Sequence, residues 1–300
     1  MSAIESWSTS AASNNSASPD GFPENMAPSG VNNSAREVMA SLKTWHDKIT
    51  SLPLIGGLTL SNNGSDATND IDISAGYACA TGGGALMVLA ASLTKRLDAA
   101  WAVGTNQGGL DTGTIANDVY HLWLIRRSDT GVVDALFSAS ATSPTMPTNY
   151  DQKRRIGAVI RSAGAILGFS QFGDEFLLKV PVRDYSSADP GTSAVLRALT
   201  VPDGVKVIAK HSVLALDATS TADVFALITS PDQTDSAAAS DLYTLALFTP
   251  GTTDDIFDSV DLQIRTDTSA RIRTRLSASD ADISINGMTH GWMDHRDKDS

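Results

Sequence analysis

Residues 120–137 read YHLWLIRRSDTGVVDALF, and this stretch decides the fold class. Its first six residues form a continuous apolar run, which is typical of a β-strand covered on both faces. Asp129-Thr130-Gly131 then precedes a second apolar run, and a glycine at the end of a three-residue loop supplies the positive φ that closes a bulged hairpin. The stretch therefore predicts two antiparallel strands and a chain that is mainly β.

Further segments on both sides repeat this pattern. Residues 156–161 and 166–171 are separated by a short Ser-Ala-Gly-Ala turn, which predicts a second hairpin. Residues 86–100 fit either a helix or two strands. Beyond residue 185, which we take as a domain boundary because of the dense Pro-Gly turns around it, strands are predicted at regular intervals: 205–216, 223–229, 242–249, 260–266, 271–276 and 283–286.

Regular short strands predict an antiparallel β-sandwich or jelly roll. We therefore expect two such domains, a proximal one over 54–184 and a distal one over 185–300. The last alternating pair of segments, 260–266 and 271–276, flanks Asp267-Thr268-Ser269, which predicts another hairpin.

Residues 1–33 are predicted to form an extended attachment arm, because prolines and glycines stand among serines and asparagines there. The arm also contains three large apolar residues, and two interpretations remain open. One is a disordered tail, and the other is a segment that docks on another protein and orders there. In the second case the docking residues are Trp7, Phe22 and Met26.

Residues 34–53 are predicted to contain one short helix, ending before Pro53. Ser34 and Glu37 have the spacing of a capping box at its start. Apolar residues then recur in the a/d rhythm of a coiled coil. Two interpretations are open: a helix lying on a domain of its own chain, or a trimerisation segment. The residues concerned are Ala35, Val38, Leu42, Trp45 and Ile49.

Composition excludes several classes of protein. The chain has 300 residues, 22 Lys+Arg against 34 Asp+Glu, and a net charge of −12, so a nucleic-acid partner that requires phosphate neutralisation is not expected. No apolar run reaches the roughly 18 residues of a membrane span, and the first residues do not resemble a secretory signal. We expect synthesis in a cytoplasm and no membrane insertion. Cys79 is the single cysteine, so no intrachain disulfide is possible.

The sequence offers little for catalysis. Phosphate-binding loops, nucleophile elbows and zinc-protease motifs are absent, and only four glutamates are present, so we expect no enzyme and no cofactor. His290, Asp294 and His295 have the chemistry of metal ligands or of simple solvated residues. Arg271, Arg273 and Arg275 either contact an anionic surface ligand or form the solvated face of an edge strand.

Several segments, distributed over nearly the whole chain, resemble proteins of the tail-fibre type found in tailed bacteriophages and prophages. The N-terminal ones are WSTSAASNN (7–15), PDGFPE (19–24) and MAPSGVNNSARE (26–37). The later ones are TKRLDAAW (94–101), RSDTGVVD (127–134), TSPTMPTNY (142–150), RRIG (154–157), SPDQTD (230–235) and GWMD (291–294).

This resemblance implies a virion protein of the tail, made in the host cytoplasm and assembled as a homotrimer. Its N-terminus would attach to tail or baseplate proteins, and its distal domain would contact a host surface glycan or lipopolysaccharide. Unlike many fibres, the chain has no repetitive shaft, which favours a short appendage. Two alternatives stay open: a tailspike-like polysaccharide depolymerase and a purely structural tail adaptor.

Overall fold

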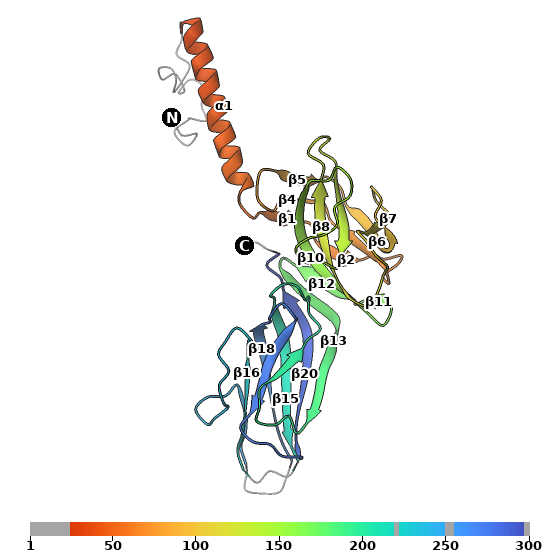
Figure 1. The fold of residues 1–300 in the computed structure, drawn as a ribbon, viewed down its shortest axis with the longest axis vertical. Helices are drawn as coiled ribbons and strands as arrows, with labels where there is room; N and C mark the ends of the chain where they lie inside the picture. Colours follow the sequence, from red (N-terminus) through yellow and green to blue (C-terminus); the bar gives the residue numbers. More distant parts are fainter. Residues whose placement is uncertain (1–24, 219–221, 250–254, 297–300) are drawn as a thin grey trace.

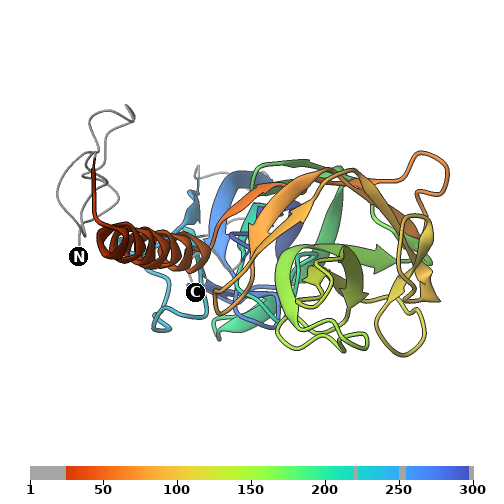
Figure 2. The same ribbon diagram turned by 90° about the horizontal axis from the view of Figure 1, so that it is seen from above.

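The computed structural model describes residues 25–218, 222–249 and 255–296, and it is mainly β, as predicted. Helix α1 (Pro28–Thr50) comes first and extends away from the β domains, which follow one after the other below it (Figure 1). Seen from above, α1 extends to one side, away from the proximal domain (Figure 2). The helix and the far tip of the distal domain are therefore at opposite ends of the molecule.

The proximal domain is built around a strongly curved eight-stranded sheet of order β11-β10-β8-β9-β7-β6-β3-β2. A three-stranded sheet of order β1-β4-β5 packs against it. The strands are β1 (Ile55–Gly57), β2 (Leu60–Asn62), β3 (Asp70–Ile73), β4 (Gly76–Cys79), β5 (Leu86–Leu89), β6 (Leu93–Ala100), β7 (Gln107–Leu110), β8 (Val119–Arg126), β9 (Val133–Ser138), β10 (Gln152–Ser162) and β11 (Ala165–Ile166).

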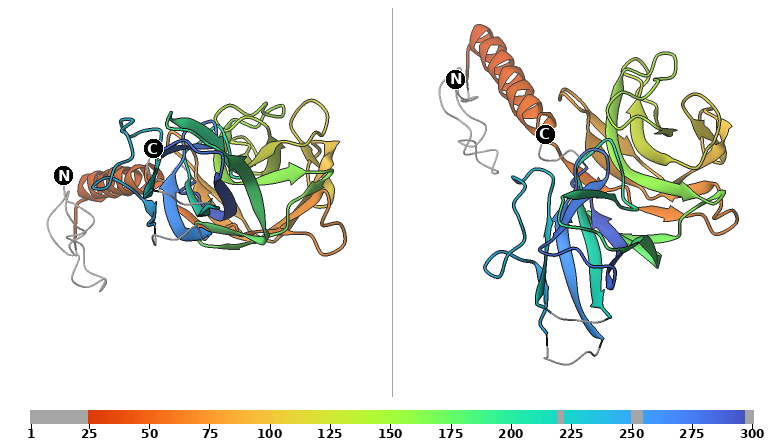
Figure 3. Two further views of the ribbon diagram at one scale, coloured as in Figure 1. Left: turned by 90° about the horizontal axis from the view of Figure 1, so that it is seen from below. Right: turned by 60° about the horizontal axis from the view of Figure 1, so that its bottom comes forward.

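The distal domain is a β-sandwich of a five-stranded sheet, β12-β13-β20-β15-β18, and a four-stranded sheet, β14-β19-β16-β17 (Figure 3). Its strands are β12 (Phe169–Phe172), β13 (Glu175–Ala188), β14 (Val195–Ala198), β15 (Ile208–Asp217), β16 (Val224–Thr229), β17 (Leu245–Leu247), β18 (Ile256–Arg265), β19 (Arg271–Leu276) and β20 (Ile283–Met293).

One hydrophobic core runs through both domains, because a single cluster of buried side chains extends from Leu58 in the proximal domain to Trp292 in the distal one. Phe176 stacks on Trp292 at the junction, with ring centroids 5.4 Å apart. A second cluster fills the far end of the distal sandwich, and a third, around Trp123, covers the other face of β8. The two domains thus share buried surface.

The stretch at 120–137 folds as predicted. Strands β8 and β9 pair antiparallel, and Gly131 has a φ of 74° in the loop between them. The six central residues of β8 are all buried, as a strand covered on both faces requires. The second predicted hairpin is confirmed only at its turn, where β10 pairs with the two residues of β11, because residues 169–171 belong to β12 and pair with β13. The ambiguous segment 86–100 forms two strands, β5 and β6.

Helix α1 begins six residues earlier than predicted. Its first residue is Pro28, whose fixed φ suits the first helical position and whose missing amide hydrogen costs nothing there. Residues 28–33 therefore belong to the helix and not to the arm. Ser34 lies in the second helical turn, so the predicted capping box with Glu37 is wrong, and the N-cap residue Ala27 makes no side-chain cap.

The predicted hairpin at Asp267-Thr268-Ser269 is also wrong. Strand β18 pairs with β15 in the five-stranded sheet, whereas β19 pairs with β14 and β16 in the four-stranded one. The turn therefore carries the chain across the sandwich. Residue 185, the proposed domain boundary, lies inside β13. The proximal sheet is not wholly antiparallel, because β6–β7 and β7–β9 pair in parallel.

Candidate functional site: interaction surfaces and buried polar centres

The predicted apolar stripe on α1 is largely open to solvent. Leu42 is 46% exposed and Trp45 49% exposed. The stripe begins earlier than predicted, since Val31 precedes Ala35 by four residues, lies within the helix and is also exposed. In proteins, most of the stability of a helix comes from the packing of its apolar face. The stripe is therefore a candidate surface for association.

Among the described residues, the helix meets the β domains at its C-terminal end. The Cys79 thiol in β4 lies 3.7 Å from the carbonyl oxygen of Ile49, and Thr50 is buried. The body of α1 lies along neither domain (Figure 1). In the part of the chain that the structure describes, α1 thus projects as a separate arm. No helix there combines the length and apolarity that crossing a lipid bilayer requires.

Of the predicted docking residues, Trp7 and Phe22 fall outside the described residues. Met26 is described, half-buried just before α1, and its sulfur lies 4.0 Å from the hydroxyl oxygen of Ser34. Met26 therefore contacts its own helix.

The arginine row faces outward from β19, while the residues between them point into the sandwich. Each guanidinium has a partner on its own chain. Arg271 pairs with Asp267 at 2.8 Å, Arg273 donates to the carbonyl of Gln233, and Arg275 pairs with Asp235 at 2.8 Å. Because β19 has a neighbour on both sides, it is not the edge strand that we predicted. Arg273 and Arg275 fasten the loop at 231–235 to the sheet.

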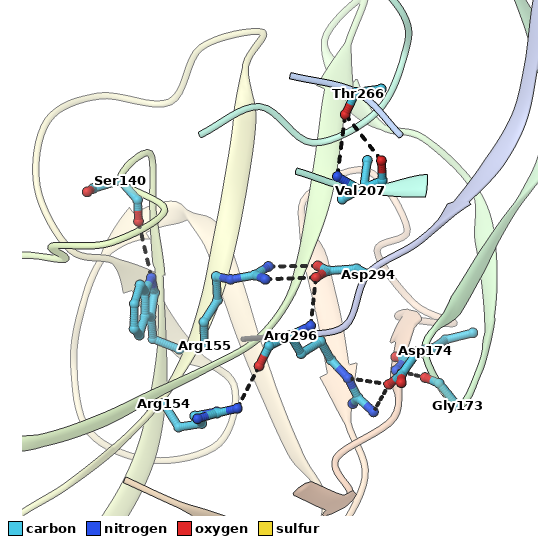
Figure 4. Close-up of polar contacts among 11 residues, drawn as sticks. Ser140, Arg154, Arg155, Gly173, Asp174, Val207, Thr266, Asp294 and Arg296 are labelled. Atoms are coloured by element: carbon cyan, nitrogen blue, oxygen red, sulfur yellow. Dashed lines mark hydrogen bonds and ion pairs between the residues drawn. The ribbon is translucent and has the colours of Figure 1, made fainter. Parts of the chain in front are cut away.

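A buried ion pair joins the two domains. Arg155 lies in β10, and Asp294 follows β20. The two terminal guanidinium nitrogens of Arg155, Nη1 and Nη2, each donate to one carboxylate oxygen of Asp294 at 2.7 Å (Figure 4). Burial by itself would raise the pKa of Asp294, but the charge and hydrogen bonds of Arg155 and the amide of Arg296 lower it below its ordinary value. Asp294 is consequently a structural anion.

Neighbouring contacts extend this centre. Arg154 donates to the carbonyl of Arg296 at 2.8 Å, and the Arg296 guanidinium pairs with Asp174 at 2.7 Å (Figure 4). The C-terminal segment after β20 is thereby held against both β10 and the β12–β13 turn. These contacts fix the relative orientation of the two domains.

His290, Asp294 and His295, for which the sequence left metal binding open, have separate surroundings. Asp294 is engaged by Arg155, while the His290 ring nitrogen Nε2 lies 2.9 Å from the Ser212 hydroxyl on the neighbouring strand β15. His295 is exposed. Among the described residues, no group of three or more His, Cys, Asp or Glu side chains is placed to hold a metal ion.

A buried polar cluster around His211, which the sequence did not predict, lies between the two distal sheets. The Tyr185 hydroxyl is 3.1 Å from His211 Nε2, and Thr289 donates to the Asp184 carboxylate at 2.5 Å. Thr200 donates to the same carboxylate through both its amide and its hydroxyl. His211 and Thr289 are 1% and 0% exposed, so a substrate has no access to them.

Burial sets the ionisation of this cluster. It lowers the pKa of His211 to about 4, with a smaller contribution from nearby His290, and it raises the pKa of Tyr185. Burial also raises the pKa of Asp184, although hydrogen bonds from Thr289 and Thr200 oppose this. His211 is therefore neutral at pH 7 and serves as a hydrogen-bonding partner inside the sandwich.

The central segments that carry the family resemblance meet in the proximal domain. Lys95 Nζ lies 3.2 Å from Asp134 Oδ1, with both side chains 1% exposed, and burial lowers the pKa of Lys95 although the charge of Asp134 opposes this. Trp101 packs edge-on against Tyr150 with ring centroids 5.2 Å apart. These segments thus supply buried packing and charge pairs.

No protein-family model matches the chain, and no curated protein matches it.

Proposed function

We propose that this chain is a structural protein of a bacteriophage tail, either a tail fibre or a tail-tip appendage. In this proposal its N-terminal residues attach it to tail or baseplate proteins, α1 joins three copies, and the distal β domain contacts the host cell surface. The observation that carries the proposal is the exposed apolar stripe on a helix that projects from the β domains.

Association through α1 follows from the cost of leaving this stripe in water. Apolar side chains spaced by three and four residues from Val31 to Ile49 form a continuous seam on the helix, and each buried square ångström contributes about 25 cal/mol. A copy of the same helix supplies the complementary seam. Three copies are our preference because the resemblance to tail-fibre-type proteins, which implies a homotrimer, includes residues 26–37 at the start of this helix.

The arrangement of the elements supports the proposal that one end of the molecule attaches to the phage and the opposite end faces the host. Helix α1 lies at one end, and the distal sandwich ends at the other (Figure 1). Arg155 and Asp294 join the domains in between through a buried pair. Such a joint suits a rigid spacer that carries its far end at a fixed distance from its attachment point.

We also propose that the chain catalyses no reaction and requires no cofactor. The most chemically suggestive cluster, around His211 and Thr289, is buried and hydrogen-bonded within the sandwich. The depolymerase and the structural adaptor remain the alternatives that an experiment must separate.

The test is the composition of purified phage particles from the strain that encodes the chain. We expect mass spectrometry to detect the chain and immunogold labelling of the full-length protein to mark the tail end. Particles from a strain with the gene deleted serve as the control and should lose the label. Absence of the chain from particles would overturn the proposal. Release of reducing sugar ends from host polysaccharide by the purified chain would favour the depolymerase.

A further inference from the structure

A cleft of about 580 Å³ lies between β17 and β18, the edge strands of the two distal sheets. Residues 243–248 line one side and residues 255–258 the other. This volume falls within the roughly 300–1,000 Å³ range that small-molecule sites occupy. The cleft is therefore large enough for a ligand of several rings.

The cleft lies toward the end of the molecule farthest from α1. Along β15, Ile208 pairs with Met293, next to the interdomain ion pair, whereas Asp217 pairs with Ile256 at the cleft. Nine residue steps of an extended strand separate these ends, which is about 30 Å. In Figure 1 and Figure 3 the start of β18 accordingly lies at the far end of the sandwich.

Exposed aromatic side chains concentrate at this cleft. Tyr243, Phe248 and Phe257 are 45%, 60% and 73% exposed. In the part of the chain that the structure describes, only three other aromatic side chains are comparably exposed, namely Trp45, Tyr77 and Phe172. Exposed apolar rings gathered in one place mark a binding surface more often than isolated ones do.

The rings of Tyr243 and Phe248 are held in place by the ring of another residue, Phe225. Phe225 in β16 pairs in register with Ala246, and its ring centroid lies 5.4 Å from that of Tyr243 and 6.0 Å from that of Phe248. Packing against Phe225 limits the rotamers that the two rings can adopt. A ligand that stacks on them therefore meets an ordered surface.

Charge and size narrow the choice of ligand. Asp255 and Asp258 line the cleft, and none of the described residues that line it is Lys, Arg or His, so an anionic sugar or a phosphate would be repelled. A quaternary ammonium group, which aromatic rings and carboxylates also bind, needs a much smaller cage than this one. An uncharged sugar fits both the aromatic rings and the carboxylates of the cleft. Its C–H face stacks on the rings, and its hydroxyl groups donate hydrogen bonds to the carboxylates.

We propose that this cleft binds an uncharged saccharide of the bacterial surface, and this proposal rests on the proposed function as a tail protein. The rings of Tyr243, Phe248 and Phe257 supply stacking, and the carboxylates of Asp255 and Asp258 accept hydrogen bonds from sugar hydroxyls. This cleft thus replaces the arginine row of β19 as the surface that contacts the host, since those arginines are already paired within the chain.

The probe is deproteinised surface polysaccharide from the strain on which the phage grows, separated by anion exchange into a neutral and an anionic fraction. We expect the full-length chain to bind the neutral fraction, with little dependence on salt. Tyr243→Ala and Phe248→Ala should each weaken binding roughly tenfold. Phe172→Ala is the matched control, because it removes a ring that is 85% exposed elsewhere, and it should leave binding unchanged. Thermal melting checks that every variant folds.

Three results would overturn the proposal: no binding to either fraction, binding to the anionic fraction alone, or equal loss of binding in the Phe172 variant. Binding that weakens steeply with salt would point to a cationic ligand and would also contradict it. Detection of the chain on phage tails is a separate measurement, so a protein that is present on tails but binds no neutral polysaccharide would refute the cleft and leave the proposed function standing.

Discussion

Arg155 and Asp294 are 139 residues apart in the sequence and form two hydrogen bonds of 2.7 Å between buried side chains. One residue belongs to the proximal sheet and the other follows the last strand of the distal sandwich. Their pairing, together with the stacked rings of Phe176 and Trp292, makes the interface between the domains a part of the folded core.

Asp294→Asn should destabilise the protein strongly. The substitution removes the carboxylate charge that pairs with the buried guanidinium of Arg155, and breaking a buried pair by removing one partner costs about 3–5 kcal/mol. Equilibrium urea unfolding measures the loss. Asp129→Asn is the control, because its partner Arg127 lies at the surface, and it should change the unfolding midpoint little. A wild-type midpoint for Asp294→Asn would refute a stabilising pair.

The ion pair of Arg155 with Asp294 should also contribute to the loss of folding stability at acidic pH. Because the pKa of Asp294 is lowered in the folded state, the unfolded chain binds more protons at acidic pH. Its contribution is present above the ordinary pKa of aspartate and is lost as the pH falls through the folded value. Unfolding free energies measured from pH 6 downward, about the range in which carboxyls begin to protonate, should therefore fall more steeply for the wild type than for Asp294→Asn.

His211 should make a second, separate contribution to acid sensitivity. Its folded pKa of about 4 lies below the ordinary histidine value of 6.5, so the unfolded state takes up the proton first. Stability is thus complete above pH 6.5 and declines as the pH falls toward 4. NMR titration of the His211 ring in the folded protein tests this directly. Protonation of the ring near pH 6.5 with the fold intact would show that the buried cluster does not suppress its charge.

Gly287→Ala should destabilise the distal sandwich. Gly287 pairs with Tyr185 across β13 and β20, and an added Cβ would lie 2.1 Å from the Tyr185 ring. Displacing the ring also disturbs its contact with His211, and overpacking of this kind costs about 1–3 kcal/mol. Gly64→Ala provides the control, since nothing lies within 4 Å of its added Cβ. Equal melting temperatures for the two variants would contradict this close approach.

Leu42→Lys should weaken self-association, because it places a charge in the middle of the apolar stripe of α1. Ala40→Lys adds the same charge two residues away, at an exposed position outside the 3–4 spacing of the stripe, and should leave association intact. Sedimentation velocity over a range of concentrations compares the two. Equal behaviour of both variants would mean that the stripe is not the association surface.

Local patterns predicted local structure well. The hairpin of β8 and β9 and the existence of a helix with an apolar stripe follow from the order of neighbouring residues. The start of α1 was misplaced because Ser34 and Glu37 have the spacing of a cap, whereas Pro28 is an equally good first residue. Two helix-start signals six residues apart compete, and the sequence alone does not rank them.

Strand pairings and side-chain contacts between residues far apart in the sequence could not be predicted. Strands β18 and β19 alternate clearly and are adjacent in sequence, yet they lie in opposite sheets, because the choice of partner depends on the whole core. One feature of the sequence pointed to the ion pair of Arg155 with Asp294. Two arginines stand directly before the apolar run of β10, and a charge that is buried with such a strand needs an opposite charge beside it. No such feature pointed to the cluster around His211, because its members are scattered from Asp184 to Thr289.

The central claim is that three copies of the chain associate through α1. The mass of the full-length protein in solution, measured by multi-angle light scattering at micromolar concentration, tests it most directly. We predict a mass near three times the 31.4 kDa of one chain. A mass that stays near 31.4 kDa over the whole concentration range would contradict the claim.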